Sequence, residues 1–308
     1  MRNFWIDTDT ASDDAVAILM ALRTPDVNVL GISVVAGNVP VDQCAKNARY
    51  TVELCGKTTP VYLGASRPLM HEPVWAHFFH GQDGMGNMNY PEAKLPLAKG
   101  NAVDAFINAV RAHPGDITLI TLGPLTNIAL AVRIAPDIAR KISMCYVMGG
   151  AAVTLGNVSP AAEFNIYVDP EAAQIVFHSG IPLLMVGWEH CRGQANISEK
   201  EMAQVRSFKT PYADFALDCN ATAIATNKKW LSEPGLALPD PVTMAVALDP
   251  TICTQRSAHY VDVETVSAVT RGMTVVDQLG VTNKNANIEI CWEIDIQRWK
   301  ELLYKTLQ

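Results

Sequence analysis

The sequence has few charged side chains and no cluster of positive ones. Charged residues make up 18% of its 308 residues, the formal net charge is −7, and no run of Lys or Arg occurs. Binding to nucleic-acid phosphates depends on clustered cations, so this composition argues against a nucleic-acid partner. Hydrophobic residues make up 49% of the chain, which is too much for a disordered protein and enough for a large core.

The chain also lacks a cysteine pattern and a long apolar run. Its seven cysteines are odd in number, scattered and never spaced as CxxC, so neither a disulfide framework nor a zinc site is indicated. The first apolar run is too short for a secretion signal, and no run is long enough to span a bilayer. We therefore expect a cytoplasmic protein with reduced, mostly buried thiols and no membrane partner.

The sequence has no internal repeat and no low-complexity stretch, and we expect a single domain over residues 1–308. Short apolar runs without alternation favour parallel strands that are buried on both faces. Such runs lie at residues 4–6, 27–35, 61–63, 117–122, 142–147 and 182–186. Helical patterns between them lie at residues 13–23, 41–55, 102–112, 125–134 and 170–178. This alternation predicts an α/β fold with an open, mostly parallel, doubly wound (Rossmann-like) sheet flanked by helices.

The pattern changes after Trp188. We expect additional C-terminal helices at residues 198–207, 211–230 and 241–248, and a closing amphipathic helix at residues 294–307. Two further segments suggest additional strands, with antiparallel pairing as one option, at residues 257–263 and 272–277. In a doubly wound sheet, ligands bind beyond the carboxyl ends of the strands, so the residues that follow each apolar run are the first candidates for a site.

Four carboxylates follow the first predicted strand closely, namely Asp7, Asp9, Asp13 and Asp14. Their mutual repulsion is costly unless a cation or hydrogen-bond donors compensate it. Capping of the following helix by Ser12 or Asp13 would account for one or two of them but not readily for four. Calcium takes about 6–8 oxygen ligands, of which Asp9 and Asp14 could supply several. The absence of His and Cys from the cluster weighs against zinc.

The pattern DTDTASDDAVAI at residues 7–18 resembles the N-terminal aspartate signature of nucleoside hydrolases. Seven more motifs follow in the order of that family: VAGN at 35–38, HGQDGMGN at 80–87, TLGPLTN at 121–127, VMGGA at 147–151, GNVSPAAEFNIYVDPEAA at 156–173, PDPVTMAVALDP at 239–250 and TRGMTVVD at 270–277. One such motif would be weak, but eight in the family order are highly specific. Nearly the whole chain is therefore similar to the inosine-uridine nucleoside hydrolase family.

The resemblance implies an enzyme that hydrolyses the N-glycosidic bond of ribonucleosides to ribose and free base. It implies calcium as the cofactor, held by the side chains of Asp9, Asp14 and Asp240 and by the backbone carbonyl of Leu122. Asp9, beside a metal-bound water, is then the candidate general base. The ribose-contacting positions that match are Asp13, Asn38, Met148, Asn157, Glu163, Asn165 and Asp240. Relatives are often dimers or tetramers, so by analogy we expect a homodimer or homotetramer.

Some of these residues can also be interpreted without a role in binding. Asn38 and Asn157 could be solvated turn residues, and a Met in an apolar strand, such as Met148, is more often plain core. The run Glu163–Asn165 stands among small apolar residues and is harder to explain without a binding role.

The pattern breaks at Pro239. In the better-known branch of the family, a His at this position is assigned as the acid that protonates a purine leaving group, and proline cannot donate a proton. His80 is one candidate for a replacement acid, although a loop His could simply be an exposed polar residue. Further base-side candidates are Asn227, Trp230 and the cluster Trp188–Cys191, in which Cys191 is a reactive thiol or, more commonly, a buried small hydrophobe. The sequence leaves the preferred base open.

Two rival functions fit part of the sequence. Asp7-Thr8-Asp9 also fits the nucleophile loop of haloacid-dehalogenase-like phosphatases, in which Asp7 would be phosphorylated and magnesium would be the metal. That hypothesis leaves Glu163 and Asp240 unexplained. The other rival is a nucleoside-binding protein that lacks turnover, motivated by Pro239. Within the hydrolase hypothesis, the product is ribose and not ribose phosphate, because no phosphate-cradling loop of the P-loop type is present.

Overall fold

The protein is built around one sheet of nine strands in the order β3-β2-β1-β4-β5-β6-β9-β7-β8. The computed structural model describes residues 1–231 and 234–308, and the side chains of Trp230 and Leu231 lie outside that description. The strands are β1 (Arg2–Thr8), β2 (Val27–Val34), β3 (Val61–Leu63), β4 (Ile117–Thr121), β5 (Ile142–Met148), β6 (Leu183–Val186), β7 (Cys253–Val263), β8 (Thr274–Asp277) and β9 (Ile288–Ile294).

Most neighbouring strands are parallel. The pairs from β3 across to β9 are parallel, whereas β7 pairs antiparallel with both β9 and β8. The order β3-β2-β1-β4-β5-β6 is the doubly wound order, in which the strand sequence reverses between β1 and β4. The predicted open, mostly parallel, doubly wound sheet is therefore confirmed, and the antiparallel option for the additional strands is confirmed as well.

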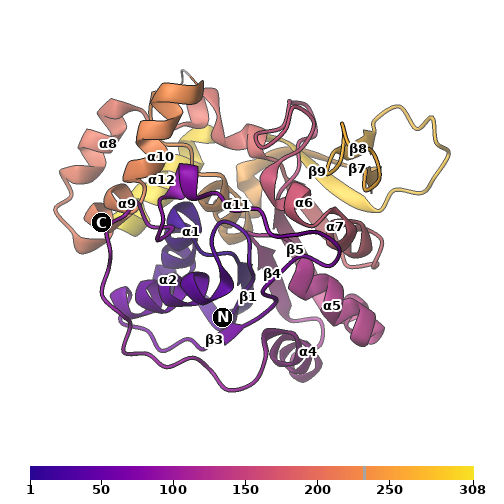
Figure 1. Ribbon diagram of the computed structural model, residues 1–308, viewed down its shortest axis with the longest axis horizontal. Coiled ribbons are helices and arrows are strands. Elements are labelled where there is room, and N and C mark those ends of the chain that lie inside the picture. The colour runs from indigo at the N-terminus through magenta and orange to yellow at the C-terminus, as the bar shows by residue number, and fades with distance from the viewer. Residues whose placement is uncertain (232–233) are drawn as a thin grey trace.

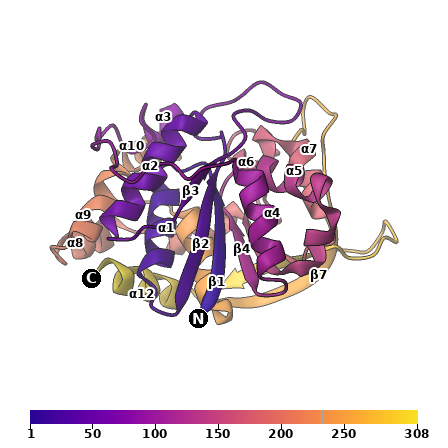
Figure 2. The same ribbon diagram turned by 90° about the horizontal axis from the view of Figure 1, so that it is seen from below.

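Helices cover both faces of the sheet (Figures 1 and 2). One face is covered by α1 (Ser12–Arg23), α2 (Val41–Leu54), α9 (Pro211–Asp218), α11 (Pro239–Leu248) and α12 (Ile296–Leu307). The other face is covered by α4 (Ala102–Ala112), α5 (Thr126–Ile134) and α7 (Pro170–Phe177). The remaining helices are α3 (His77–His80), α6 (Phe164–Val168), α8 (Glu199–Arg206) and α10 (Ala221–Thr226). None of the helices in the described part of the chain has both the length and the apolar character that a membrane span requires.

Side chains of the central strand β1 alternate between two cores. Phe4 and Ile6 pack into the core beneath α1 and α11, and Trp5 packs into the core beneath α4. The indole N–H of Trp5 donates to the Ser33 hydroxyl at 3.0 Å, and its ring lies 5.5 Å from that of Phe106. Both faces of the strand are thus buried, which is why its sequence is an apolar run without alternation.

The predicted helix at residues 211–230 is wrong as a single element. The structure divides it into α9, α10 and a π-helical turn, Asn227–Leu231. At the break, the side-chain amide of Asn220 donates to the Ala216 carbonyl at 2.9 Å, a bond that competes with the main-chain ladder of a continuous helix. The π-helical turn is one of the local distortions that often occur at functional sites.

The C-terminal elements have other bounds than predicted, and β8 begins at Thr274 rather than at residue 272. β7 begins at Cys253 rather than at residue 257, and the closing helix begins at Ile296. β9 was not predicted, because Glu289 and Glu293 interrupt its apolar residues, although the burial of Ile288 and Ile290 on alternate positions is the signal of a strand. This strand joins the parallel part of the sheet to the β7–β8 hairpin.

Candidate active site

A pocket of about 170 Å³ lies at the carboxyl ends of the parallel strands, where a doubly wound sheet binds its ligands. The predicted residues that line it are Asp13, Asn38, His80, Leu122, Met148, Asn157, Glu163, Asn165, Trp188, Cys191, Asn227 and Asp240. Asp9 and Asp14 do not line the pocket and are fully buried. Trp230 lies outside the described side chains. Residues from distant parts of the chain thus meet in the predicted place.

The carboxylates of Asp13, Asp14 and Asp240 form a buried cluster at one end of this pocket. Each offers an oxygen, and these oxygens lie within 4.8 Å of one another. Asp13 and Asp14 belong to the first turn of α1, Asp240 belongs to the first turn of α11, and the two helices pack together. Burial, and then the charges of Asp14, Asp13 and Asp9, raise the pKa of Asp240 well above its ordinary value. A bound cation would relieve this repulsion.

Asp9 is enclosed between two glycines of the sequence motifs. Its Oδ2 accepts the Asn38 main-chain N–H at 2.6 Å, and its Oδ1 is buried and accepts no hydrogen bond. A Cβ at Gly37 would overlap Oδ2, and a Cβ at Gly123 would lie 2.5 Å from Oδ1. Burial and the charge of Asp14 raise the pKa of Asp9 well above its ordinary value. An unpartnered oxygen in an all-oxygen donor set fits a hard divalent cation such as calcium.

Asp14 carries the capping bond at the start of α1. Its carboxylate accepts the Ala11 main-chain N–H at 2.9 Å and also accepts the hydroxyl of Thr8 and the side-chain amide of Asn38. The alternative of helix capping by Ser12 or Asp13 is not observed: the Ser12 hydroxyl lies 2.8 Å from His80 Nδ1, and Asp13 Oδ1 accepts no hydrogen bond. Capping therefore accounts for one carboxylate of the cluster.

Glu163 and Asn165 line the pocket as well and form its polar wall. Glu163 caps α6, and its two oxygens accept the main-chain N–H groups of Asn165 and Gly150, each at 2.9 Å. Burial raises the pKa of Glu163 to about 7. The side-chain amide of Asn165 donates to the Leu122 carbonyl at 2.8 Å and lies 3.2 Å from both the carbonyl oxygen and Sδ of Met148. The wall is thus fixed before any substrate arrives.

Asn38 and Asn157, which the sequence also allows as solvated turn residues, differ in their exposure. Asn38 is buried, so the solvated-turn reading does not apply to it. Asn157 is exposed, and its side-chain carbonyl accepts the Phe164 main-chain N–H at 2.9 Å. Both side chains nevertheless reach the pocket.

His80 is buried at the end of α3, contrary to the reading of an exposed loop residue. Its Nδ1 lies 2.8 Å from the Ser12 hydroxyl and 3.7 Å from Asp13 Oδ1. Burial lowers the pKa of His80 to about 4, so the imidazole is neutral at pH 7. The His80 imidazole therefore lies beside Asp13 of the acidic cluster and also lines the pocket.

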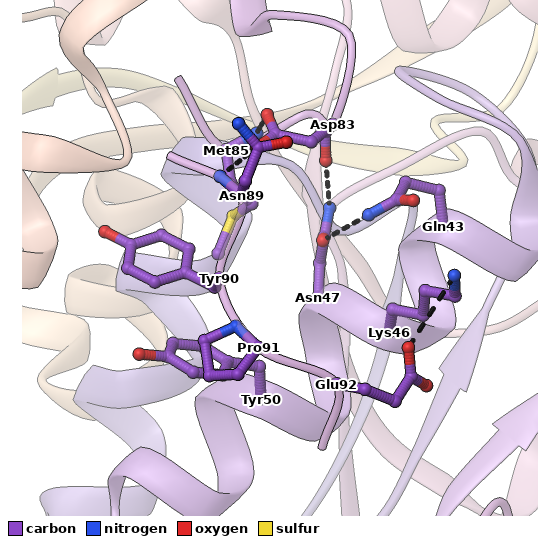
Figure 3. A pocket seen from close by; sticks show the side chains of 10 residues that line it. All are labelled: Gln43, Lys46, Asn47, Tyr50, Asp83, Met85, Asn89, Tyr90, Pro91 and Glu92. Carbon is purple, nitrogen blue, oxygen red and sulfur yellow. Dashed lines mark hydrogen bonds and ion pairs between the residues drawn. The ribbon is translucent and has the colours of Figure 1, made fainter. Parts of the chain in front are cut away.

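Asn47 connects the loop after His80 to the loop between β1 and α1 by hydrogen bonds. The sequence motifs do not include this residue. The Asn47 amide donates to the carbonyls of Thr10 and Asp83, both at 2.9 Å, and its oxygen accepts from Gln43. Figure 3 shows these side chains around a second pocket, beside α2. A single polar residue within a predicted helix carries no signal of this role.

Aromatic side chains form another part of the pocket lining, which we call the aromatic end. Phe79, Phe164 and Trp188 line it, together with Cys191 and the buried Asn227, whose side-chain oxygen accepts no hydrogen bond. Cys191 is buried, and burial raises the pKa of its thiol, so it is a small hydrophobe and not a reactive thiol. The aromatic residues were not predicted as site residues, apart from the cluster that includes Trp188, because in sequence they look like core.

Asp7 does not reach the pocket. It is fully buried in β1, where one carboxylate oxygen accepts hydrogen bonds from Ser33 and Asn127. A phosphate group has no access to this position, so the phosphatase hypothesis loses its nucleophile.

Comparison with known proteins places this site in a family. The family model for the inosine-uridine preferring nucleoside hydrolase matches residues 4–301. An uncharacterised protein of Schizosaccharomyces pombe is 38% identical over 304 residues, which are 98% of this chain and 97% of that protein. The pyrimidine-specific ribonucleoside hydrolase RihA of Shewanella woodyi is 36% identical over 310 residues, which are 100% of this chain and 98% of the relative.

Solved structures of nucleoside hydrolases match the fold along nearly the whole chain. A plant nucleoside hydrolase is 30% identical, with a TM-score of 0.93 over 99% of this chain and 98% of its own. A purine-preferring ribonucleoside hydrolase from Gardnerella vaginalis is 31% identical, with a TM-score of 0.92 over 99% of this chain and 98% of its own. Sequence motifs, fold and pocket agree with these matches, and the chain belongs to the inosine-uridine preferring nucleoside hydrolase family and is a ribonucleoside hydrolase.

Proposed function

We propose that the chain hydrolyses the N-glycosidic bond of ribonucleosides to ribose and free base, with calcium as its cofactor. The observation that carries this proposal is the meeting of a buried carboxylate cluster, a polar wall and an aromatic end in one pocket. The cluster suits a hard cation, the wall suits a sugar with several hydroxyls, and the aromatic end suits a planar base.

The calcium would be held by the carboxylates of Asp9, Asp14 and Asp240 and by the Leu122 carbonyl, as the family resemblance implies. The unpartnered oxygen of Asp9 and the close approach of Asp14 to Asp240 support this set. Asp13 lies in the same cluster and is free to accept a ribose hydroxyl. Bound calcium supplies charge compensation and makes a coordinated water more acidic.

Asp9 is the proposed general base, which takes a proton from the attacking water while the sugar gains oxocarbenium character. Asp13, Asn38, Asn157, Glu163 and Asn165 are the proposed ribose contacts, and Met148 packs beside them. Because the capping bonds of Glu163 hold its carboxylate in place, it can accept a ribose hydroxyl without a rearrangement. A site that satisfies each hydroxyl discriminates strongly against sugars that lack one.

His80 is the proposed group that assists departure of the base, with Asn227 and Trp230 as base-side contacts. With a pKa of about 4, the buried imidazole carries no extra proton at pH 7. It can still donate from a neutral N–H to the departing base, and its bond with Ser12 keeps the ring oriented. Pro239 lines the same pocket and supplies no proton.

A panel of purine and pyrimidine ribonucleosides, assayed for free base, tests the proposal. We expect ribose and free base, loss of turnover on chelation, and recovery with calcium. Cleavage that requires phosphate and yields ribose phosphate would contradict the proposal. Tight binding without turnover of any nucleoside, including an activated nitrophenyl riboside, would establish the non-catalytic alternative.

We also propose a homodimer or homotetramer that works in the cytoplasm. Four apolar side chains near β8 support a contact between protein surfaces, because each is at least 74% exposed: Val266, Val269, Leu279 and Val281. Light scattering of the purified chain tests the assembly, and a monomer at micromolar concentration would contradict it.

A further inference from the structure

Residues 270–274, with the sequence TRGMT, have no role in the site as described so far. They form the end of the turn between β7 and β8 together with the first residue of β8, and Figure 1 shows this hairpin beside α6. Thr274, the first residue of β8, is only 4% exposed and does not line the active-site pocket. Any effect of this segment on the substrate must therefore pass through other residues.

Thr274 fixes the main chain of Ala151. Its hydroxyl donates to the Ala151 carbonyl at 2.7 Å and accepts the Ala151 N–H at 3.0 Å. One side chain therefore satisfies both main-chain groups of a residue 123 positions away in the sequence. The fit is tight, because a Cβ at the neighbouring Gly150 would lie 2.7 Å from Thr274 Cγ2. The path of the chain after β5 is thus set by β8.

The constraint continues from Ala151 to the polar wall of the pocket. Gly150, the residue before Ala151, donates its N–H to Glu163 Oε2 at 2.9 Å. The other oxygen of Glu163 accepts the Asn165 N–H at 2.9 Å, and the Asn165 side chain in turn donates to the Leu122 carbonyl. An unbroken series of hydrogen bonds and peptide links therefore joins Thr274 to the two residues that the proposed function assigns to ribose.

A second contact of the same segment acts on α6. Gly272 has a φ of +79°, and a Cβ there would lie 2.7 Å from the Cα of Tyr167, so the two main chains approach closely. The Arg271 guanidinium lies 4.1 Å from the centroid of the Tyr167 ring. The turn is closed by the Gly272 N–H, which donates to the Glu264 carbonyl at 2.7 Å. Tyr167 belongs to the same short helix as Asn165.

We propose that residues 270–274 clamp the ribose-binding wall and that Thr274 is its main positioning residue. The inference rests on the proposed function, in which Glu163 and Asn165 contact ribose. Thr274 acts on them through Ala151 and Gly150. Loss of its hydroxyl loosens the wall and reduces the preference for ribose over 2′-deoxyribose, because this preference depends on donors and acceptors held in place.

Three variants of the 308-residue protein, prepared with calcium, test the clamp. Thr274→Val removes the hydroxyl at nearly constant shape, and Thr274→Ser retains it. Thr306→Val is the matched control, because Thr306 is also a buried threonine and its hydroxyl donates to the Leu302 carbonyl within α12, away from the pocket. For each protein, kcat and KM are measured with a riboside and its 2′-deoxy analogue, and amide hydrogen exchange is followed over residues 149–168.

The expected result is specific to the Thr274 hydroxyl. Thr274→Val should lower the ratio of kcat/KM for the riboside over the 2′-deoxyriboside about tenfold and accelerate exchange over residues 149–168. Thr274→Ser and Thr306→Val should keep the ratio within about twofold of the wild type. An unchanged ratio and unchanged exchange in Thr274→Val would overturn the proposal. An equal decline in Thr306→Val would also overturn it, because the effect would then be a general loss of stability.

Arg271→Ala keeps the test decisive if Thr274→Val does not fold. Arg271 is partly exposed, so its removal should preserve the fold while exchange in α6 accelerates. Unchanged exchange there would overturn the clamp. If the wild type hydrolyses no nucleoside, the proposed function fails, whereas the exchange measurement still decides whether the hairpin holds the wall.

Discussion

The two ends of the pocket are built in different ways. At the metal end, Asp9, Asp13 and Asp14 come from one short stretch after β1, and Asp240 joins them from α11. At the base end, the lining residues come from separate segments of the chain: residues 78–80, 164, 188, 191, 226 and 227. The metal end consists of charged groups, whereas the base end includes the aromatic rings of Phe78, Phe79, Phe164 and Trp188.

This difference has a physical consequence for each end. Buried like charges demand compensation, so a change at the metal end alters the charge balance of the whole cluster. Aromatic and aliphatic walls adjust their shape at smaller cost, because dispersion contacts are individually weak. We therefore expect large effects from changes at the metal end, intermediate effects at the ribose wall, and substrate-dependent effects at the base end.

Asp9→Ala should have the largest effect on turnover. It removes both the proposed base and a metal ligand, so kcat should fall by about 10³-fold or more. The fold should survive, because burial and Asp14 already raise the pKa of Asp9, and its removal relieves repulsion in the calcium-free protein. Turnover and thermal unfolding should be measured together. A fully active Asp9→Ala protein would show that the metal end is misassigned.

Asn165→Ala should reduce kcat/KM for a riboside by about 10²-fold or more while the protein remains folded. The variant leaves the Leu122 carbonyl without its donor and removes a proposed ribose contact. The loss should be smaller for the 2′-deoxy analogue, which is expected to be a poor substrate of the wild type. Steady-state kinetics on both sugars provide the check, and equal wild-type rates for the two would contradict the ribose wall.

His80→Ala should have an effect that depends on the leaving group. Natural nucleosides should slow by about 10²-fold or more, whereas a nitrophenyl riboside, whose leaving group departs without a proton, should slow much less. Pro239→His is the matched comparison, because it restores the usual residue of the family and should leave most activity intact. Equal slowing of both substrates by His80→Ala would make His80 a positioning residue and not a donor to the base.

The smallest expected effect is a pH dependence of stability that involves Glu163. Burial raises its pKa from 4.5 to about 7, so the folded state holds this proton more tightly than the unfolded state does. The calcium-free protein should therefore lose stability as pH rises from about 4.5 to about 7. Glu163→Gln should flatten this decline by about 1 kcal/mol or more between the two ends of the window, measured by denaturant unfolding. An identical decline in stability with pH in the wild type and in Glu163→Gln would contradict a raised pKa of Glu163.

The difference between the two ends also explains which parts of the fold and of the site could be predicted from the sequence. The strands β1 to β6 and the acidic cluster were predictable, because apolar runs mark buried parallel strands and repelling carboxylates in one stretch require a partner. The base end was predictable only in part: His80, Trp188 and Asn227 were candidates and line the pocket. Phe79 and Phe164 were missed because in sequence they look like core residues, and the break at Asn220 depends on a local side-chain bond. Asn47 and Thr274 act through main-chain groups of distant segments, which no spacing of residues reveals.

The proposed function requires the carboxylates at the metal end to hold one calcium ion. Calorimetric titration of the calcium-free wild type, Asp9→Ala and Asp14→Ala proteins with calcium tests this requirement. We predict one bound ion in the wild type and affinity lower by about 10²-fold or more in each variant, because each loses a charged ligand. Unchanged calcium affinity in both variants would contradict the claim.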